Sequence, residues 1–329
     1  MTIPILLFIL GLVLLIYGGD WFVDGATGIA KRFKIPEILI GATVVSIGTT
    51  LPEVMVSATS AVSGHGEIAY GNAIGSIICN TALIAAVTIA IRPSKIDRSA
   101  LTLPVVFFYI AAALYVTVAV TTGFFSRTVG FLLLSLFLIY MGISVYRVLK
   151  APAVPNLQTA EEPEQEEKAE EKSSLLKEII LLVLGAALIA WGADLLVDNG
   201  TIIAEKLGVP ESVIALTFVA LGTSLPELVT AVTSLVKGHG ALSLGNIIGA
   251  NLFNLVLVSG VSTVLSPFAI PSGKELFGIT SSLVLDIPVM AVAMTLLTVP
   301  ALIRGKLSRV QGIILLAIYA GFCVVQFAM

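Results

Sequence analysis

The chain has 329 residues, of which 57% are hydrophobic and only 12% are charged. Its mean hydropathy of +1.05 excludes a soluble globular protein, and a formal net charge of −3 gives no indication of nucleic-acid binding. Apolar runs of about 20 residues, long enough to cross the hydrocarbon core of a bilayer, recur along the whole chain. The composition therefore predicts an all-α membrane protein.

Ten candidate transmembrane helices follow one another along the chain. The first apolar run begins at Ile3 without a basic segment or a small-residue cleavage site, so we interpret it as a retained membrane helix rather than a secretory signal peptide. Cys79 and Cys323 both lie in apolar runs, which gives no indication of a disulfide framework. The ten expected spans are residues 3–29, 37–63, 67–91, 100–120, 127–149, 175–203, 211–237, 241–265, 275–299 and 308–328.

One hydrophilic stretch, residues 150–174, separates the fifth span from the sixth. It is rich in proline and glutamate, and its low hydrophobicity and dense charge predict a flexible linker. A regulatory calcium-binding role for its glutamates is the alternative, but nothing in the sequence fixes their carboxylates in a cage. The expected organisation is an N-terminal five-helix unit (1–149), an acidic linker (150–174) and a C-terminal five-helix unit (175–329).

The distribution of basic residues predicts the orientation in the membrane. With ten spans, all of the 18 Lys and Arg residues except Arg127, Lys206 and Lys274 fall on the side opposite the N-terminus. Cytoplasmic loops carry an excess of Lys and Arg, so this side is expected to be cytoplasmic. Both termini would then lie outside, and the acidic linker would lie in the cytoplasm.

The two halves of the chain contain the same sequence pattern. Residues 39–80 align without a gap on residues 213–254, at a constant offset of 174. Each half holds five spans, and because five is odd, the second half must be inverted in the membrane relative to the first. Inverted repeats are typical of secondary transporters, which bind their substrate near the midplane where the halves meet.

The repeated segment places a carboxylate and a proline inside each half. Residues 48–53 read Gly-Thr-Thr-Leu-Pro-Glu and residues 222–227 read Gly-Thr-Ser-Leu-Pro-Glu. A charged group at membrane depth costs about 2.5–3.5 kcal/mol on insertion scales, and proline leaves a carbonyl of the preceding turn without its partner. Hydroxyls, freed carbonyls and two carboxylates would form an all-oxygen site for a hard cation such as Ca²⁺ or Na⁺. Pairing of Glu53 and Glu227 with buried bases is the alternative, but no Lys or Arg lies inside a neighbouring span.

The following span of each half carries a Gly-Asn-x-x-Gly motif. The glycines, four residues apart, favour close helix packing. Polar groups recur there at helical spacing, and they either line the ion path or form hydrogen bonds between helices. These polar groups are Asn72, Ser76, Asn80, Asn246 and Asn254.

The paired motifs resemble the alpha repeats of the calcium/cation antiporter superfamily, and in particular those of the prokaryotic sodium/calcium exchangers. The resemblance covers nearly the whole chain. It implies two inverted five-helix repeats and a plasma-membrane antiporter that exchanges sodium for calcium by alternating access, with the first and sixth spans sliding against the other helices. It implies no enzymatic activity and no cofactor, since the transported Ca²⁺ and Na⁺ bind as substrates. The oligomeric state, monomer or homo-oligomer, stays open.

The same resemblance implies a set of ion ligands. Glu53 and Glu227 would be the central calcium ligands, and Thr49 and Thr223 would contribute backbone carbonyls. The remaining expected ligands are Thr50 and Ser224 in sodium or calcium sites, Ser46 and Ala220 with carbonyls for flanking sodium sites, Ser76 at an outer sodium site, and Asn80 and Asn254 at the middle of the cluster.

Two departures from the family pattern bear on the counter-ion. Ala250 stands where such exchangers often have Ser, and Asn254 stands where many have Asp. The second departure argues against the potassium-dependent branch. The Gly-Thr-x-Leu-Pro-Glu motif favours sodium over protons as the counter-ion. Proton/calcium exchange, potassium-dependent exchange and a cation channel remain the alternatives.

Several polar residues outside the motifs receive simpler interpretations. His65 and His239 lie in Gly-His-Gly turns at opposite faces and are expected to be turn residues. Asp20 and Asp24, like Asp194 and Asp198 in the second half, either guide cations or are paired or hydrated near the ends of their helices. Asp286, in the ninth span, has no assigned role.

Overall fold

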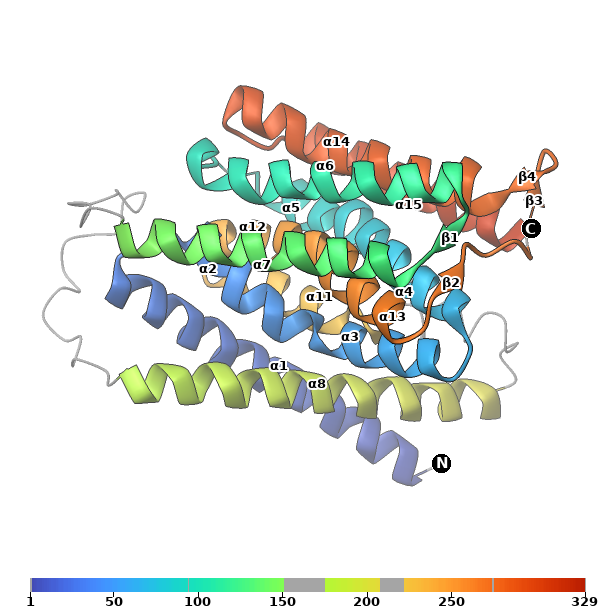
Figure 1. Cartoon of the computed structure of the whole chain (residues 1–329). Coiled ribbons are helices and arrows are strands. Elements are labelled where there is room, and N and C mark those ends of the chain that lie inside the picture. Colours follow the sequence, from blue (N-terminus) through green and yellow to red (C-terminus); the bar gives the residue numbers. More distant parts are fainter. Residues whose placement is uncertain (1, 94, 151–174, 208–221, 274, 329) are drawn as a thin grey trace, which may run out of the picture.

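The computed structural model describes residues 2–93, 95–150, 175–207, 222–273 and 275–328. Within these ranges nine helices are long and apolar enough to cross a membrane, which confirms the expected all-α membrane protein. Both termini lie at the same end of the bundle (Figure 1). The nine helices are α1 (Thr2–Phe33), Glu37–Val62, Gly66–Ile91, α6 (Arg98–Thr121), α7 (Arg127–Lys150), α8 (Leu175–Lys206), Gly240–Leu265, Ser282–Arg304 and α15 (Arg309–Ala328).

The seventh predicted span is only partly described, and the ninth begins later than predicted. Of the seventh, predicted at 211–237, the described part is the shorter helix α11 (Leu225–Val236), and residues 211–221 lie outside the described residues. The ninth was predicted to begin at 275, but β3 (Glu275–Leu276) and β4 (Ile279–Thr280) form a hairpin there. Phe277 and Gly278 have φ values of 56° and 75°. Successive left-handed residues cannot continue a right-handed helix, so the span begins only at Ser282.

Within the described residues, four spans contain a π-helical turn. Glu37–Val62 consists of α2 (Glu37–Ile40), η1 (Gly41–Val45) and α3 (Ser46–Val62), and Gly66–Ile91 consists of α4 (Gly66–Cys79), η2 (Asn80–Ala85) and α5 (Ala86–Ile91). Gly240–Leu265 consists of α12 (Gly240–Phe253), η4 (Asn254–Val258) and α13 (Ser259–Leu265), and the ninth span of η5 (Ser282–Asp286) and α14 (Ile287–Arg304). The turns η2 and η4 start at Asn80 and Asn254, which are equivalent under the offset of 174, so the repeated sequence reproduces this local distortion. Such π-helical turns are frequent at functional sites.

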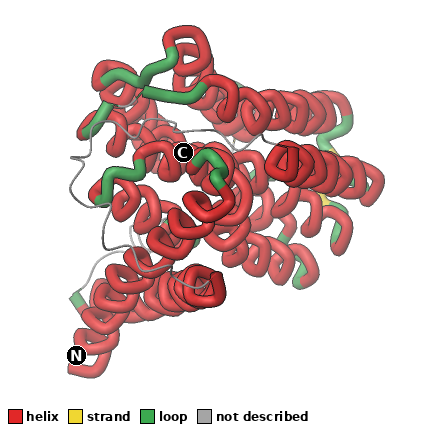
Figure 2. Tube along the Cα trace, turned by 90° about the vertical axis from the view of Figure 1, so that its left-hand side faces the viewer, coloured by secondary structure: helices red, strands yellow, loops and turns green. Residues whose placement is uncertain are grey.

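The long helices α1 and α8 cross as an antiparallel pair beside the main bundle (Figures 1 and 2). Their contact is built on glycines. A Cβ added to Gly11 would lie 2.8 Å from the carbonyl oxygen of Gly192, and one added to Gly18 would lie 3.0 Å from that of Gly185. Because glycine lets the two backbones approach this closely, the two helices form one tightly packed pair.

The remaining helices enclose the most buried part of the chain. Every residue of α12 from Leu242 to Phe253 is buried. The loops at each end of the bundle are joined by short β contacts: β1 (Phe124–Phe125) pairs with β2 (Phe268–Ala269), and Lys95 forms an isolated bridge with Lys306. We call the end with the Lys95–Lys306 bridge the basic end, and the end with both termini the terminal end.

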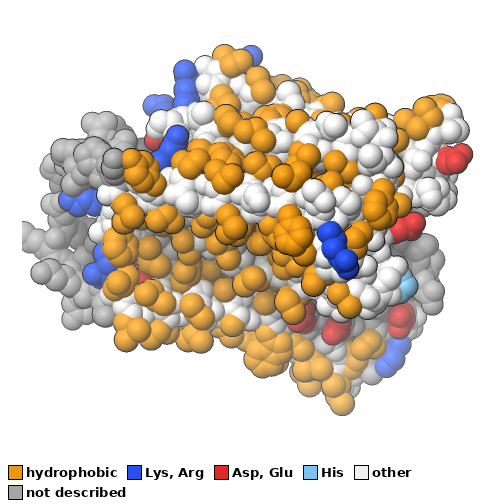
Figure 3. All heavy atoms as spheres, viewed as in Figure 1, with side chains coloured by type: hydrophobic (Ala, Val, Ile, Leu, Met, Phe, Trp, Pro, Cys, Tyr) orange, Lys and Arg blue, Asp and Glu red, His pale blue; other side chains and the backbone are white. Residues whose placement is uncertain are grey.

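The outer surface has the pattern of a membrane protein. Hydrophobic side chains cover the middle of the face seen in Figure 3, while most Lys and Arg side chains in view gather at the basic end. This is the distribution on which the orientation was predicted, and it keeps charges out of the hydrocarbon region.

Candidate cation-binding site

The two repeated glutamates are buried in the centre of the bundle. Glu53 lies in α3 and Glu227 in the first turn of α11, and both residues are 0% exposed. Their carboxylates are close enough to repel each other. Among the described residues no group forms a hydrogen bond or an ion pair with any of the four carboxylate oxygens. Burial of an uncompensated charge costs several kcal/mol per ion, and a cation bound between the two ionised carboxylates would offset that cost.

Neutral oxygen atoms surround the two carboxylates. The hydroxyls of Thr49 and Thr50 lie beside the Glu227 carboxylate. The hydroxyl oxygens of Thr50 and Ser224 are buried and have no hydrogen-bond partner within the described ranges. Hydroxyl and carboxylate oxygens are the ligands that Ca²⁺ and Na⁺ prefer. Thr49 and Thr50 of the first repeat therefore meet Glu227 of the second.

The asparagines at the two equivalent π-helical turns also carry unused polar atoms. Asn80 and Asn254 are fully buried, and neither the amide nitrogen nor the amide oxygen of Asn80 has a partner in the described part of the chain. Asn254 donates a 3.0 Å hydrogen bond to the carbonyl of Ala250, which leaves its amide oxygen available. Ser76, on α4, is buried, 4% exposed.

The other pair of asparagines links the repeats. Thr49 Oγ1 donates to Asn246 Oδ1 at 3.1 Å, and Thr223 Oγ1 donates to Asn72 Oδ1, also at 3.1 Å. Each bond joins a threonine of one repeat to an asparagine of the other, and the two bonds are equivalent under the offset of 174. Of the two roles open for Asn72 and Asn246, the hydrogen bonds favour contact between helices.

A hydroxyl that is present in the first half alone changes how the equivalent asparagine amides are held. Asn72 Nδ2 donates to the Glu53 carbonyl at 3.2 Å and to Ser57 Oγ at 2.8 Å. Asn246 Nδ2 is buried without a partner among the described residues. The residue equivalent to Ser57 is Ala231, which has no hydroxyl to accept this bond. The amide of Asn72 is consequently held more firmly than that of its counterpart.

The backbone near the two prolines is also unequal. Helix α3 continues through Pro52, whereas in the second half Thr223 and Ser224 form a turn and α11 begins only at Leu225. One proline therefore lies inside a helix and the other in a first turn, where its missing N–H costs little. Ser46 Oγ donates to the Gly41 carbonyl at 2.6 Å. Ala220 lies outside the described residues.

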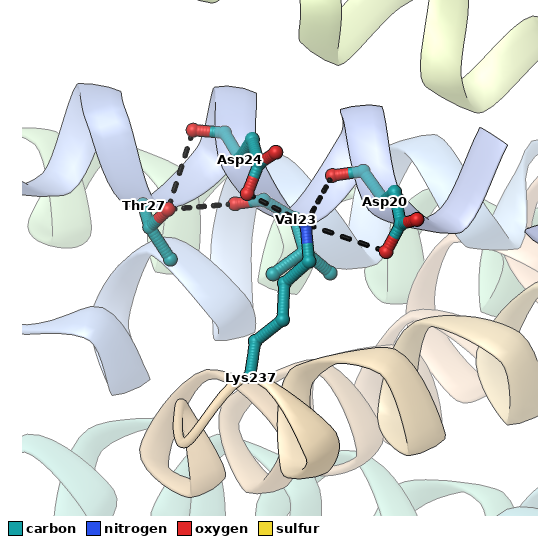
Figure 4. A network of polar contacts seen from close by, with 5 residues as sticks. All are labelled: Asp20, Val23, Asp24, Thr27 and Lys237. Carbon is teal, nitrogen blue, oxygen red and sulfur yellow. Dashed lines mark hydrogen bonds and ion pairs between the residues drawn. The ribbon is translucent and has the colours of Figure 1, made fainter. Parts of the chain in front are cut away.

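Asp20 and Asp24 on α1 are paired with a basic residue (Figure 4). Lys237, at the end of α11, lies 2.7 Å from Asp24 Oδ1 and 3.3 Å from Asp20 Oδ1, and its ammonium group also donates to the Asp20 carbonyl at 3.1 Å. Pairing, one of the two expected roles, thus applies to these aspartates. No ion pair involves Asp194 or Asp198 in the described ranges, where the residue equivalent to Lys237 is Ser63.

Sequence reasoning missed several polar residues. Thr230 and Ser234 lie on the same face of α11 as Glu227, three and seven residues further on, and both hydroxyls are buried without a partner in the described part of the structure. Their helical spacing could have identified them.

Tyr140, which donates to the Ala42 carbonyl at 2.7 Å, gave no local signal in the sequence. His239 contacts Glu37 at 2.7 Å rather than serving only in a turn, and Asp286 accepts a 2.7 Å hydrogen bond from Gln326.

The chemistry of the site depends on oxygen atoms from several chain segments. Within the described ranges no group of three or more His, Cys, Asp or Glu side chains is placed to hold a metal ion. Two carboxylates together with hydroxyl, amide and carbonyl oxygens suit a hard, exchangeable cation better than a tightly held transition metal.

Comparison with known proteins identifies the family. The pattern of the sodium/calcium exchanger protein family matches residues 3–146 and 177–328. The chain is 31% identical to the sodium/calcium exchanger MaX1 of Methanosarcina acetivorans over 99% of both chains. It is 34% identical to the inner membrane protein YrbG of Escherichia coli over 81% of both.

The fold agrees with solved structures of the same family. A structure of the sodium-calcium exchanger NCX_Mj, soaked with Na⁺ and Sr²⁺, superposes with a TM-score of 0.79 at 31% identity, covering 100% of this chain and 99% of that one. The likeness extends over both repeats and supports a ten-helix transporter rather than an enzyme. The chain belongs to the sodium/calcium exchanger family of integral membrane proteins.

Proposed function

We propose that this protein is a secondary active antiporter that exchanges Na⁺ for Ca²⁺ by alternating access at the midplane site, so that sodium entry drives calcium extrusion. The observation that carries the proposal is the pair of fully buried carboxylates, Glu53 and Glu227, with no positive partner among the described residues. Two carboxylates neutralise one Ca²⁺. Several Na⁺ ions on the surrounding oxygens would compete for the same charges, and that competition couples the two fluxes.

The proposed ligands are those implied by the sequence. Glu53 and Glu227 bind Ca²⁺ at the centre, and Thr50, Asn80 and Asn254 are supported by buried polar atoms that have no other partner in the described structure. Ser224 has the same support. The remaining proposed ligands are the carbonyls of Thr49, Thr223, Ser46 and Ala220, and the hydroxyl of Ser76.

Alternating access requires one part of the protein to move against the site. The α1–α8 pair is the proposed moving part, because its glycine contacts join the two helices closely and it lies beside the bundle. A Cβ on Gly19 of α1 would lie 2.7 Å from Val229 and 2.8 Å from the Thr233 hydroxyl, so α1 packs tightly on α11. This contact and the Lys237 ion pairs support a conformer closed at the basic end.

The orientation completes the proposal. The basic end faces the cytoplasm, both termini face outward, and the membrane is the plasma membrane of a prokaryotic cell. The family membership of YrbG and MaX1, and the distribution of basic residues, support this assignment. The two five-helix units, 1–149 and 175–329, would be the inverted halves, with 150–174 as the cytoplasmic linker; residues 151–174 lie outside the described residues.

Calcium uptake into proteoliposomes tests the function. We expect uptake only when the vesicles contain sodium, and none when potassium, choline or a pH gradient replaces the sodium gradient. Glu53→Gln and Glu227→Gln should each abolish exchange. Glu67→Gln, which removes an exposed carboxylate from α4, serves as the matched control and should exchange normally.

The same assay separates the alternatives. Uptake driven by a proton gradient would move the chain to the proton-coupled exchangers, and a requirement for potassium would indicate the potassium-dependent branch. Uptake that is indifferent to every counter-ion would indicate a channel. Full exchange by either glutamine variant would refute the assignment of the site.

A further inference from the structure

Six basic side chains gather at one corner of the basic end, outside the transport site. They come from the loop between α5 and α6, the loop between α14 and α15, and the helix ends that flank these loops. All six are exposed, and none forms an ion pair with an acid that the structure describes. We call this set the basic corner; it consists of Arg92, Lys95, Arg98, Arg304, Lys306 and Arg309.

The acidic residue within the first loop does not neutralise the basic corner. Asp97 is the N-cap of α6, and its Oδ1 accepts hydrogen bonds from the amide of Ser99 at 2.9 Å and from the Ser99 hydroxyl at 2.7 Å. Figure 3 shows Lys and Arg side chains clustered at the end of the molecule where α6 begins. With one carboxylate against six basic side chains, the corner presents a concentrated positive charge.

The backbone holds the two loops together. Lys95 and Lys306 face each other in a β-bridge, and the amide of Ile96 donates to the Gly305 carbonyl at 2.9 Å. The Arg98 guanidinium lies against Gly305, where an added Cβ would come within 2.9 Å of Arg98 Nε. Two lysines are thus brought side by side despite their like charges, and the repulsion between them would fall if an anion lay between them.

The opposite end of the bundle shows that this connection needs no charge. Under the offset of 174, Lys95 corresponds to Ala269, which pairs with Phe124 in the β1–β2 contact. There the junction is filled by stacked aromatic rings, Phe125 and Phe268, with centroids 5.6 Å apart. Joining the loops is therefore a property of the repeated fold, and the basic side chains are an addition at one end only.

Apolar side chains border the basic corner. Ile91, Ile303 and Val310 are 63%, 68% and 65% exposed, and each is the neighbour in sequence of an arginine of the corner. They lie on helices that span the membrane, where such exposure means contact with acyl chains. A ligand that binds both the basic corner and the bordering apolar side chains needs an anionic head and a hydrocarbon tail.

We propose that the basic corner binds the headgroup of an anionic phospholipid, with the acyl chains against the bordering isoleucines and valine. Clusters of Lys and Arg at the cytoplasmic ends of membrane helices attract anionic lipids. Arg92 also donates to the Leu235 carbonyl at 3.3 Å, in the last turn of α11. The bound lipid would therefore lie beside α11, the helix that carries Glu227. The proposal holds whichever ion the protein transports.

Native mass spectrometry of the full chain tests the proposal, with phosphatidylglycerol and phosphatidylcholine of identical acyl chains as probes. The test variant is Lys95→Gln/Arg304→Gln/Lys306→Gln, because within the described ranges these residues join the two loops through the backbone and their side chains form no hydrogen bond or ion pair. The control variant, Lys34→Gln/Arg147→Gln/Lys177→Gln, removes the same charge from exposed positions at the same end. We expect the unaltered protein to retain at least fivefold more phosphatidylglycerol than phosphatidylcholine.

The test variant should lose this preference, and the control variant should keep it. Equal retention of both lipids by the unaltered protein, or equal loss in both variants, would overturn the proposal, since general surface charge would then suffice. Displacement of the lipid by glycerol 3-phosphate at equal concentration would show that the phosphate alone is recognised and would refute the lipid assignment. If the test variant does not fold, Lys306→Gln alone should reduce the preference by at least twofold, and an unchanged preference would count against the site.

Discussion

Replacement of Lys237 by serine, the residue at the equivalent position of the first repeat, should weaken closure at the basic end. Lys237 lies 2.7 Å from Asp24 and 3.3 Å from Asp20, with side chains that are 26%, 54% and 45% exposed. An exposed ion pair contributes about 0.2–1 kcal/mol. One ammonium group shared between two partly hydrated carboxylates therefore contributes about 1 kcal/mol, or a fivefold change in the balance of conformers.

Hydrogen–deuterium exchange in nanodiscs measures this change. In Lys237→Ser, amides at the ends of α1 and α11 nearest the basic end should exchange about two- to fivefold faster than in the unaltered protein. The difference should shrink in about 1 M salt, where the screening length falls to about 3 Å. Asp198→Asn on α8 is the control, since no ion pair involves it within the described ranges, and it should leave exchange unchanged.

A second substitution should shift the same balance of conformers in the opposite direction. Ser63→Lys would supply a cation at the position equivalent to Lys237, and under the offset of 174 its partners would be Asp194 and Asp198. It should favour closure at the terminal end and reduce the population closed at the basic end. If Lys237→Ser left the exchange rates unchanged, or if both substitutions shifted them in the same direction, the ion pairs would not bias the two states and the reasoning would be refuted.

Two further substitutions test the packing and the charge of the site. Gly18→Ala should lower the free energy of unfolding by about 1–3 kcal/mol in thermal denaturation, because its Cβ would lie 2.9 Å from the Ile189 amide nitrogen. The control Gly142→Ala should be neutral or stabilising, because a Cβ there would have nothing within 4 Å. Equal effects of the two substitutions would disprove the glycine contact. Asn254→Asp should tighten Ca²⁺ binding about tenfold in calorimetry, because a third carboxylate joins the buried site and affinity rises with ligand charge. Unchanged affinity would place Asn254 outside it.

Much of the fold could be predicted because it is encoded in local hydrophobicity. Spans such as α6 and α15 were located within a few residues, since roughly 20 apolar residues have few alternatives to crossing a membrane. The hairpin at 275–280 was missed because Leu276, Phe277 and Ile279 continue into the apolar span, and only the backbone of Phe277 and Gly278 reveals the turn. Composition cannot report a positive φ at a phenylalanine.

Local sequence also indicated part of the candidate site. The duplicated Pro-Glu motifs pointed to Glu53 and Glu227, because a carboxylate inside an apolar segment is conspicuous in any sequence. The roles of Asn72 and Asn246 were not decided, since a polar residue at helical spacing suits an ion path and a helix contact equally well. Their hydrogen bonds run to residues 151 and 197 positions away along the chain.

The sequence by itself determined the class of protein, the inverted repeat and the buried acids, because these follow from hydrophobicity, a fixed offset and the cost of charge in a membrane. Only the tertiary structure decided which side chains meet across the bundle. Lys237 is 213 residues from Asp24, and Lys95 is 211 residues from its bridge partner Lys306. Such contacts are set by the packing of many side chains across the whole bundle, and no local sequence pattern encodes that packing.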